Sequence, residues 1–303
     1  MKKLTHALAL TATFLLTPLA LAQSADVPAH IARGVAAADR TEEMTVRDAA
    51  RKPAETLMLA GLKEGEHIAE LAALGLYYST ILSAALGSEG QLDMYDMPFM
   101  EQFGAITAGN AFAATHPNSS YTAVHFNDIE FAPNLDAVYN ILFYHDLQGQ
   151  DVDTAALNAK IFAALKPGGI YLVVDHRAED GSGWRDSSTI HRIGKEVIVE
   201  EVTAAGFELA QDSDLLANPD DDKTKMVFAP GTRGSTDQAV LVVRKPHEKT
   251  EYLSITTTPN SLPRLRGRVR EGAEEIKNYN PAKIRLNVSL GRIAAAHKAG
   301  SGR

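Results

Sequence analysis

The chain has 303 residues, of which 45% are hydrophobic and 22% charged, a composition that suits an ordinary globular protein with one substantial core. Cysteine is absent, which excludes disulfides, thiolate nucleophiles and cysteine metal sites. The formal net charge is −8, but residues 245–303 hold 12 basic and 5 acidic residues, so the body of the chain is acidic and its end is basic.

The first 22 residues have the pattern of a secretory signal peptide. Lys2 and Lys3 precede an apolar run over residues 7–21, and Ala20-Leu21-Ala22 is the small-x-small pattern that signal peptidase cuts. The run is shorter than the roughly 20 residues that a membrane-spanning helix needs. We therefore expect a periplasmic or secreted protein that begins near Gln23 and has no stable membrane insertion after cleavage.

Helix and strand patterns follow in alternation. Residues 23–61 contain helical patterns interrupted at Pro53. Helices are also predicted over 77–86, 154–165 and 195–207, and strands over 67–71, 91–95, 121–126, 136–146, 170–176, 207–213 and 239–246. Continuous apolar strands such as VYNILFY are typical of a parallel sheet covered on both faces. Residues 62–246 are thus predicted to form a doubly wound α/β domain.

Residues 247–303 form a basic segment that we expect to be a solvated, partly disordered extension. Nucleic-acid binding is the alternative for such a segment. Aromatic residues do not interleave with its basic residues, and an exported protein meets little nucleic acid. We therefore predict no nucleic-acid partner.

Several stretches together resemble the class I S-adenosylmethionine-dependent methyltransferases, in particular an exported, signal-peptide-bearing branch. They are LKEGEHIAEL (62–71), YYSTILSAALGSEGQLDMYD (77–96), FYHD (143–146), ALKPGGIYLVVDH (164–176) and HRIGKEVIVEEVTAAGFEL (191–209). The resemblance covers about Thr41 to Pro246. It implies a mostly parallel, seven-stranded Rossmann-like sheet with an antiparallel last strand. It also implies that S-adenosylmethionine binds at the carboxyl ends of the first strands.

The same resemblance implies roles for residues at three strand ends. Glu70 would lie near the amino group of the cofactor, and Asp96 would accept hydrogen bonds from the ribose hydroxyls. Asn127 and Asp128 would lie near the adenine edge. The turn after Glu70 would contact the cofactor through Gly75 and Tyr77.

This turn departs from the family pattern. The family has Glu-Leu-x-Pro-Gly-x-Gly-Tyr where residues 70–77 read ELAALGLY, so Leu74 and Leu76 replace glycines and only Gly75 remains. A leucine forced into the left-handed region costs about 1–2 kcal/mol, and its side chain would enter the volume of the cofactor. We expect either that Gly75 takes the critical turn while both leucines face the core, or that S-adenosylmethionine binding is weakened or lost.

Candidate catalytic residues follow the fourth and fifth predicted strands. Tyr144-His145-Asp146 and Asp175-His176 should emerge side by side, with His191 facing them from the next helix. A histidine held by a carboxylate can act as a general base near neutral pH, so we predict that His145, with Asp146 and Tyr144, takes the proton of the methyl acceptor. The alternatives are structural ion pairs and a divalent-cation site. Because no compact ligand spacing is present, no metal is predicted.

The sequence therefore predicts an S-adenosylmethionine-dependent methyltransferase that acts on a small molecule. The alternative is a non-catalytic, methyltransferase-like ligand-binding protein of the periplasm. It is kept because the glycine turn is degenerate, and because S-adenosylmethionine is a charged cytosolic metabolite that does not cross a bilayer unaided.

Overall fold

The computed structural model describes residues 26–247. The predicted signal peptide and the basic segment from residue 248 onward lie outside the described residues. The chain divides into two units at Thr250, and the described residues all belong to the first. Among the helices of residues 26–247, none combines the length and the apolar character that crossing a bilayer requires.

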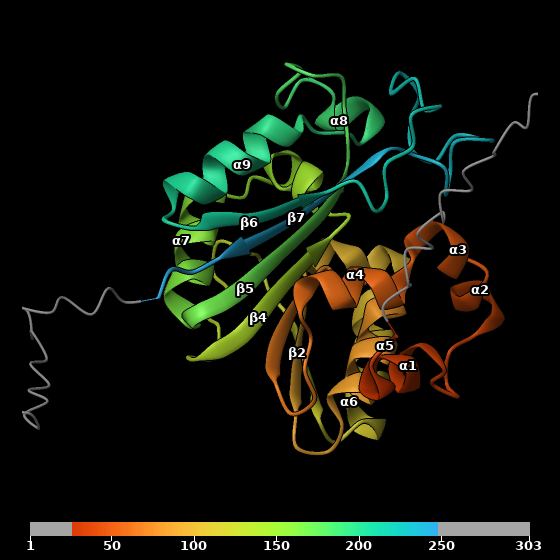
Figure 1. Cartoon of the computed structure of the whole chain (residues 1–303), viewed down its shortest axis with the longest axis vertical. Helices are drawn as coiled ribbons and strands as arrows, with labels where there is room; N and C mark the ends of the chain where they lie inside the picture. The colour runs from red at the N-terminus through yellow and green to blue at the C-terminus, as the bar shows by residue number, and fades with distance from the viewer. Residues whose placement is uncertain (1–25, 248–303) are drawn as a thin grey trace, which may run out of the picture. The chain divides into compact units, whose positions relative to one another are not determined.

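A single seven-stranded sheet forms the centre of this unit (Figure 1). Its strands are β1 (His67–Leu71), β2 (Gln91–Asp96), β3 (Ser119–Ala123), β4 (Leu135–Ile141), β5 (Leu165–His176), β6 (Glu208–Ser213) and β7 (Gln238–Arg244). The strand order is β3-β2-β1-β4-β5-β7-β6. Only β7 runs antiparallel to the other strands. The structure thus confirms the predicted doubly wound, mostly parallel seven-stranded fold.

Helices cover both faces of the sheet (Figure 1). One face packs against α1 (Ala29–Val35), α4 (Pro53–Ala60), α5 (Tyr77–Leu86) and α6 (Ala105–Thr115), and the other against α7 (Thr154–Ala164) and α9 (Lys195–Ala204). Successive residues of β4 alternate between the two cores, since Ala137 and Tyr139 join the first and Val138 the second. The remaining elements are short: α2 (Glu42–Thr45), α3 (Asp48–Arg51), α8 (Ser187–Ile190) and the 3₁₀ turns η1 (Pro98–Phe103), η2 (Tyr144–Asp146) and η3 (Gln148–Gln150).

Helix α4 begins and ends at residues that favour those positions. Pro53 opens α4, where its missing N–H would have no helical partner in any case. Gly61 closes α4 with φ +70°, and its N–H bonds back to the last turn of the helix. The α3–α4 junction lies next to α5, as the distance of 4.5 Å between the Arg51 guanidinium and the centre of the Tyr77 ring shows.

The boundaries predicted for β3, β4 and β5 were wrong. β3, predicted over residues 121–126, spans Ser119–Ala123. β5, predicted over residues 170–176, begins at Leu165 and includes the KPGG stretch, where Gly168 at φ +83° coincides with a shift in the β4–β5 register. The strand predicted to reach Asp146 ends at Ile141. Leu142 has φ +61° while its N–H bonds to Val174 O, and the chain then turns into η2. This turn is important because it aims the following histidine at β5.

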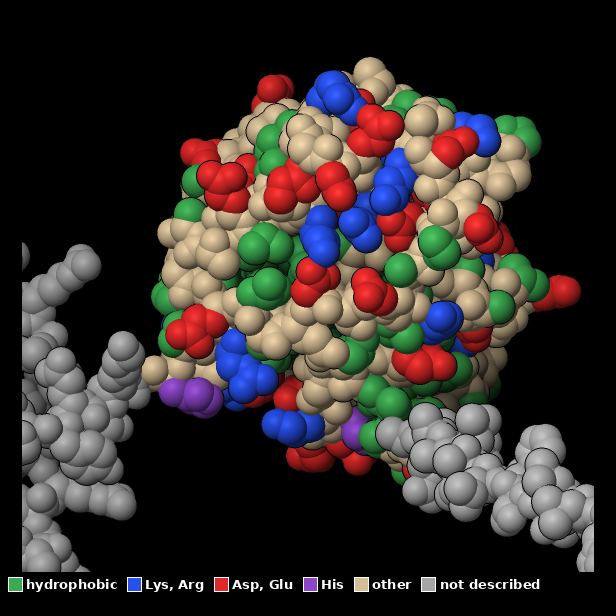
Figure 2. All heavy atoms as spheres, turned by 45° about the horizontal axis from the view of Figure 1, so that its top comes forward, with side chains coloured by type: hydrophobic (Ala, Val, Ile, Leu, Met, Phe, Trp, Pro, Cys, Tyr) green, Lys and Arg blue, Asp and Glu red, His purple; other side chains and the backbone are tan. Residues whose placement is uncertain are grey.

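Charged side chains are mixed on the surface. Figure 2 shows Lys and Arg side chains lying among Asp and Glu across the face seen there. The acidity of the body is a matter of numbers, since residues 1–244 hold 18 basic and 33 acidic residues.

Candidate functional site

The residues singled out from the sequence meet at the carboxyl edge of the parallel strands. This edge is where open α/β sheets bind ligands, because strand ends and the following turns converge there. The structure separates the residues into two groups. One group follows β1, β2 and β3 and corresponds to the implied cofactor position. The other follows β4 and β5 and contains the histidines.

Asp96, at the end of β2, is closed off from solvent. Its Oδ1 accepts a hydrogen bond from the Leu74 N–H at 3.1 Å, its Oδ2 accepts one from the Tyr121 hydroxyl at 3.0 Å, and the residue is 0% exposed. Burial raises the pKa of Asp96 to about 6, against the effect of these hydrogen bonds. Both oxygens that the resemblance assigns to a ribose are thus engaged inside the protein.

Glu70, at the end of β1, is also buried. The Ser79 hydroxyl donates a hydrogen bond to Glu70 Oε2 at 2.6 Å. Burial raises the pKa of Glu70 to about 8, and the Ser79 hydrogen bond only partly offsets this. The side chain is therefore mostly protonated at neutral pH, and a neutral acid is a poor partner for the ammonium group of the cofactor.

Three residues of the turn after β1 lie in the left-handed region: Ala72 (φ 56°), Gly75 (φ 80°) and Leu76 (φ 55°). Leu76 packs against the core, whereas Leu74 is 42% exposed. Gly75 therefore takes a left-handed turn as one alternative foresaw, but only one of the two leucines faces the core. A Cβ at Gly75 would meet no atom within 4 Å, so the glycine serves the backbone conformation.

Tyr77 is held by the N-terminal helices. Its hydroxyl donates to Asp48 Oδ1 at 2.6 Å, and Asp48 in turn forms an ion pair with Arg40. The guanidinium groups of Arg47 and Arg51 lie 4.9 and 4.5 Å from the centre of the Tyr77 ring. No sequence pattern marks this network, because Asp48 and the arginines lie about 26 to 37 residues before Tyr77 in the chain.

Asn127 is used to shape a neighbouring turn, and Asp128 is exposed beside it. The Asn127 side-chain amide donates to Asp151 O at 2.9 Å, and its oxygen accepts from the Asp153 N–H at 2.8 Å. These bonds fix the approach to α7. The implied contact of Asn127 and Asp128 with an adenine remains a prediction.

His145 and Asp175 form a buried pair between η2 and β5. His145 Nδ1 lies 2.6 Å from Asp175 Oδ1, and the His145 backbone N–H donates to Asp175 Oδ2 at 2.7 Å. Burial alone would lower the pKa of His145, but the charge of Asp175 outweighs it and raises the pKa above its ordinary value. The predicted partner, Asp146, instead lies on the other side of the ring, with Oδ2 3.5 Å from Nε2.

His191 completes this group from the end of α8. Its Nδ1 lies 3.0 Å from Asp146 Oδ1, and its ring centre is 5.4 Å from that of His145. Within residues 26–247, His145 Nε2 is buried without a hydrogen-bond partner. His176 is engaged elsewhere, since its Nδ1 lies 2.8 Å from the Thr236 hydroxyl, and burial lowers its pKa to about 3.

Tyr144 lies apart from the histidines, in the core between α7 and α9. Its hydroxyl donates to Glu201 Oε2 at 2.7 Å and accepts from the Asn158 amide at 2.8 Å. Trp184 stacks on the ring and donates to the second oxygen of Glu201. The structure therefore does not bring the Tyr144 hydroxyl to His145 Nε2, and its predicted catalytic role is left with no geometric support.

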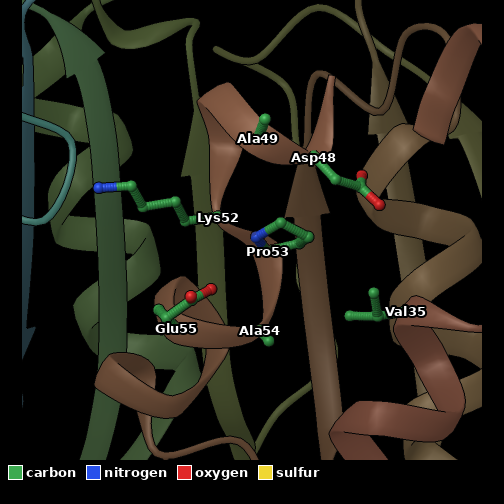
Figure 3. A pocket seen from close by; sticks show the side chains of 7 residues that line it. All are labelled: Val35, Asp48, Ala49, Lys52, Pro53, Ala54 and Glu55. Atoms are coloured by element: carbon green, nitrogen blue, oxygen red, sulfur yellow. The ribbon is translucent and has the colours of Figure 1, made fainter. Parts of the chain in front are cut away.

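A hollow of about 460 Å³ lies on the N-terminal helices, away from the histidines (Figure 3). Lys52 and Asp48 at its margin point in opposite directions. The Lys52 ammonium donates to Leu215 O, and Asp48 is paired with Arg40. The main charged groups beside this hollow are therefore already engaged within the protein.

No protein-family model and no curated protein matches the sequence. Solved structures resemble the fold. A methyltransferase described as S-adenosylmethionine-dependent, from Aquifex aeolicus, is 14% identical, with a TM-score of 0.46 over 65% of this chain and 97% of that one. A putative sarcosine dimethylglycine methyltransferase from Galdieria sulphuraria is 15% identical, with a TM-score of 0.49 over 68% and 91%. Likeness at this level carries over no cofactor or substrate.

Proposed function

We propose that the protein is a ligand-binding protein with a methyltransferase fold. It binds a small molecule at the carboxyl edge of β4 and β5, and it does not bind S-adenosylmethionine at the position that the resemblance implies. The observation that carries the proposal is Asp96. The carboxylate assigned to the ribose is fully buried, with both oxygens bonded to groups of the protein itself.

The residues of the implied cofactor position do not fit S-adenosylmethionine. A carboxylate can accept about four hydrogen bonds, but Asp96 is fully buried, so a ribose can reach it only if the groups that cover it, Leu74 and Tyr121 among them, move away. A hydrogen bond to a charged group that is lost in this way contributes about 1.5–3 kcal/mol. Glu70 is mostly neutral at pH 7 and is bonded to Ser79. Breaking the hydrogen bonds of both Asp96 and Glu70 would weaken cofactor binding by more than the loss of the two glycines alone.

The other half of the edge supports a ligand. His145 presents a buried nitrogen that has no partner among the described residues, next to the partly exposed Asp146 and His191. Buried polar atoms are normally hydrogen-bonded, so an unpaired one at a strand-end edge supports the binding of a further group there. The ligand class expected is a small molecule with polar groups.

A second candidate is an S-adenosylmethionine-dependent methyltransferase with His145 as its base. The observation in its favour is that Glu70 and Asp96 end neighbouring parallel strands, as the resemblance implies, while the space above Gly75 is open. In this case Asp175 would hold His145 Nδ1 so that Nε2 faces the acceptor.

Calorimetry separates the two candidates. Mature protein titrated with S-adenosylmethionine and S-adenosylhomocysteine should give no binding heat, and the Leu74→Gly, Leu76→Gly double variant should behave alike, because the backbone N–H of residue 74 still bonds to Asp96. Adding Tyr121→Phe to the double variant releases one Asp96 oxygen and should produce measurable binding, whereas adding Tyr95→Phe should not. Tight binding by the wild type that Asp96→Ala abolishes would establish the methyltransferase instead.

Export is part of the proposal and is supported by the signal-peptide pattern of residues 1–22 and by the lack of cysteine. Mass spectrometry of periplasmic material should show a chain that begins near Gln23. A chain that keeps Met1 and sediments with membranes would contradict export. The absence of interleaved aromatics in the basic segment likewise supports a small molecule, rather than a nucleic acid, as the partner.

A further inference from the structure

The unpaired nitrogen of His145 points to a cation. The side chain is 3% exposed, and its Nδ1 faces Asp175 at 2.6 Å. In the form that can bind a metal, the imidazole keeps its proton on Nδ1, facing the Asp175 carboxylate, and carries a lone pair on Nε2. That lone pair is directed toward the Asp146 carboxylate, which lies 3.5 Å away. A lone pair and a carboxylate that face each other in a largely buried site are unfavourable unless a proton or a metal cation lies between them.

Three donor atoms converge at this point. Asp146 has one oxygen 3.5 Å from His145 Nε2 and the other 3.0 Å from His191 Nδ1, and one donor atom from each residue can be chosen so that all lie within 4.8 Å of one another. Around a metal with bonds of about 2.1 Å, tetrahedral ligand atoms lie about 3.4 Å apart. Separations of up to 4.8 Å are wider than this, so binding requires the donors to move inward, and the partly exposed side chain of His191 has room to do so.

The pair behind His145 is the arrangement that metal-binding histidines use. A ligating imidazole commonly donates its second ring N–H to a carboxylate, which fixes the tautomer and directs the other nitrogen at the ion. Asp175 is the carboxylate in this position, and its oxygens accept hydrogen bonds from the backbone N–H groups of His145 and His176, each at 2.7 Å. The histidine–aspartate pair His116–Asp39 elsewhere in residues 26–247 has no such third donor.

We infer that His145, Asp146 and His191 bind a divalent transition-metal ion. Two imidazoles and one carboxylate suit Zn²⁺, Fe²⁺ or Co²⁺, whereas Mg²⁺ and Ca²⁺ prefer oxygen ligands. Three protein ligands leave coordination positions open for an oxygen or nitrogen donor. The exposed Phe228 ring, 5.1 Å from His191, borders that side. This inference rests on the proposed function, since the metal would lie in the ligand site proposed at the carboxyl edge of β4 and β5.

Untagged mature protein, stripped with chelator and dialysed, should bind one equivalent of Zn²⁺ in calorimetry. It should also develop visible absorption on addition of one equivalent of Co²⁺. His191→Ala and Asp146→Asn should each weaken Zn²⁺ at least tenfold, and Asp175→Asn should weaken it by about 10- to 100-fold as a positioning residue. His116→Ala is the matched control, because it removes an aspartate-paired histidine of similar exposure. It should leave the affinity unchanged.

Circular dichroism of each variant checks its fold, and His191→Ala is the decisive variant because its side chain is not buried. Absence of stoichiometric Zn²⁺ and Co²⁺ binding would overturn the inference, as would equal binding by wild type and His191→Ala, or equal affinity for Mg²⁺. The proposed function fails separately, through Asp96-dependent binding of S-adenosylhomocysteine. That result does not depend on the metal titration.

Discussion

Replacing Glu70 by glutamine should stabilise the protein at alkaline pH. Glu70 is buried beneath the turn after β1 and accepts a hydrogen bond from Ser79, a bond that a glutamine oxygen can also accept. Burial raises its pKa to about 8, so the folded chain keeps a proton that the unfolded chain loses above its ordinary pKa of 4.5. Glutamine has nearly the same shape and no proton to lose.

The sign and size follow from this difference in proton binding. Between pH 4.5 and about 8 the folded state of the wild type binds more protons than the unfolded state, so its free energy of unfolding falls as pH rises. At about 1.36 kcal/mol for each pH unit, this span corresponds to a loss on the order of 5 kcal/mol. The contribution is present in full below pH 4.5 and is lost by about pH 8.

Urea unfolding at pH 4.5, 6, 7.5 and 9 measures the effect. The free energy of unfolding of Glu70→Gln minus that of the wild type should rise steadily with pH and level off above pH 8. Glu89→Gln, on an exposed turn, is the control and should give a flat difference within about 0.5 kcal/mol. A flat difference for Glu70→Gln as well would show that Glu70 is ionised in the folded protein. It could then act as the counter-ion that the resemblance assigns.

Two further predictions concern the turn and the tyrosine. Ala72→Gly should raise the thermal midpoint or leave it unchanged. It removes the strain of a left-handed alanine, about 1–2 kcal/mol, and adds about 0.4–1 kcal/mol of chain entropy in the unfolded state. Ala108→Gly, on the exposed side of α6, should instead cost about 1 kcal/mol in the same calorimetric scan, and equal losses would contradict the left-handed turn. Tyr144→Phe should lower the free energy of unfolding by about 1–3 kcal/mol, because it removes the hydroxyl that bonds to the partly buried Glu201 carboxylate and to the buried Asn158 amide. It should not change Zn²⁺ affinity, and a tenfold change would return Tyr144 to the site.

The fold was predictable because its signals are periodic and local. Apolar strands such as 170–174 alternate with amphipathic helices, and a parallel doubly wound sheet is the arrangement that buries both faces of such strands. The end of β4 was not predictable in the same way. Residues 142–146 read as a continuation of the strand, but Leu142 adopts φ +61° because its N–H bonds to Val174 on β5. That bond exists only once the sheet has formed.

The composition of the site was only partly predictable for the same reason. Strand ends identified His145, Asp146 and Asp175 as neighbours, but their pairing depends on η2. This turn places His145 N–H and Nδ1 on Asp175 and leaves Asp146 to face His191. His191 itself comes from the left-handed residue that ends α8, a four-residue helix that no periodic signal marks. The residues of the site could be named from the sequence, but the turns between the elements decided which of them pair.

The two halves of the carboxyl edge differ in how their buried polar groups are satisfied. On the side of β1 and β2, Glu70 is bonded to Ser79, and Asp96 to Leu74 and Tyr121. A ligand there must first break bonds that the folded chain already has. On the side of β4 and β5, His145 has an unpaired buried nitrogen. Leaving such a group unpaired costs about 1–3 kcal/mol, which a bound cation or ligand would recover. Binding energy is therefore available at the second half of the edge and already consumed at the first.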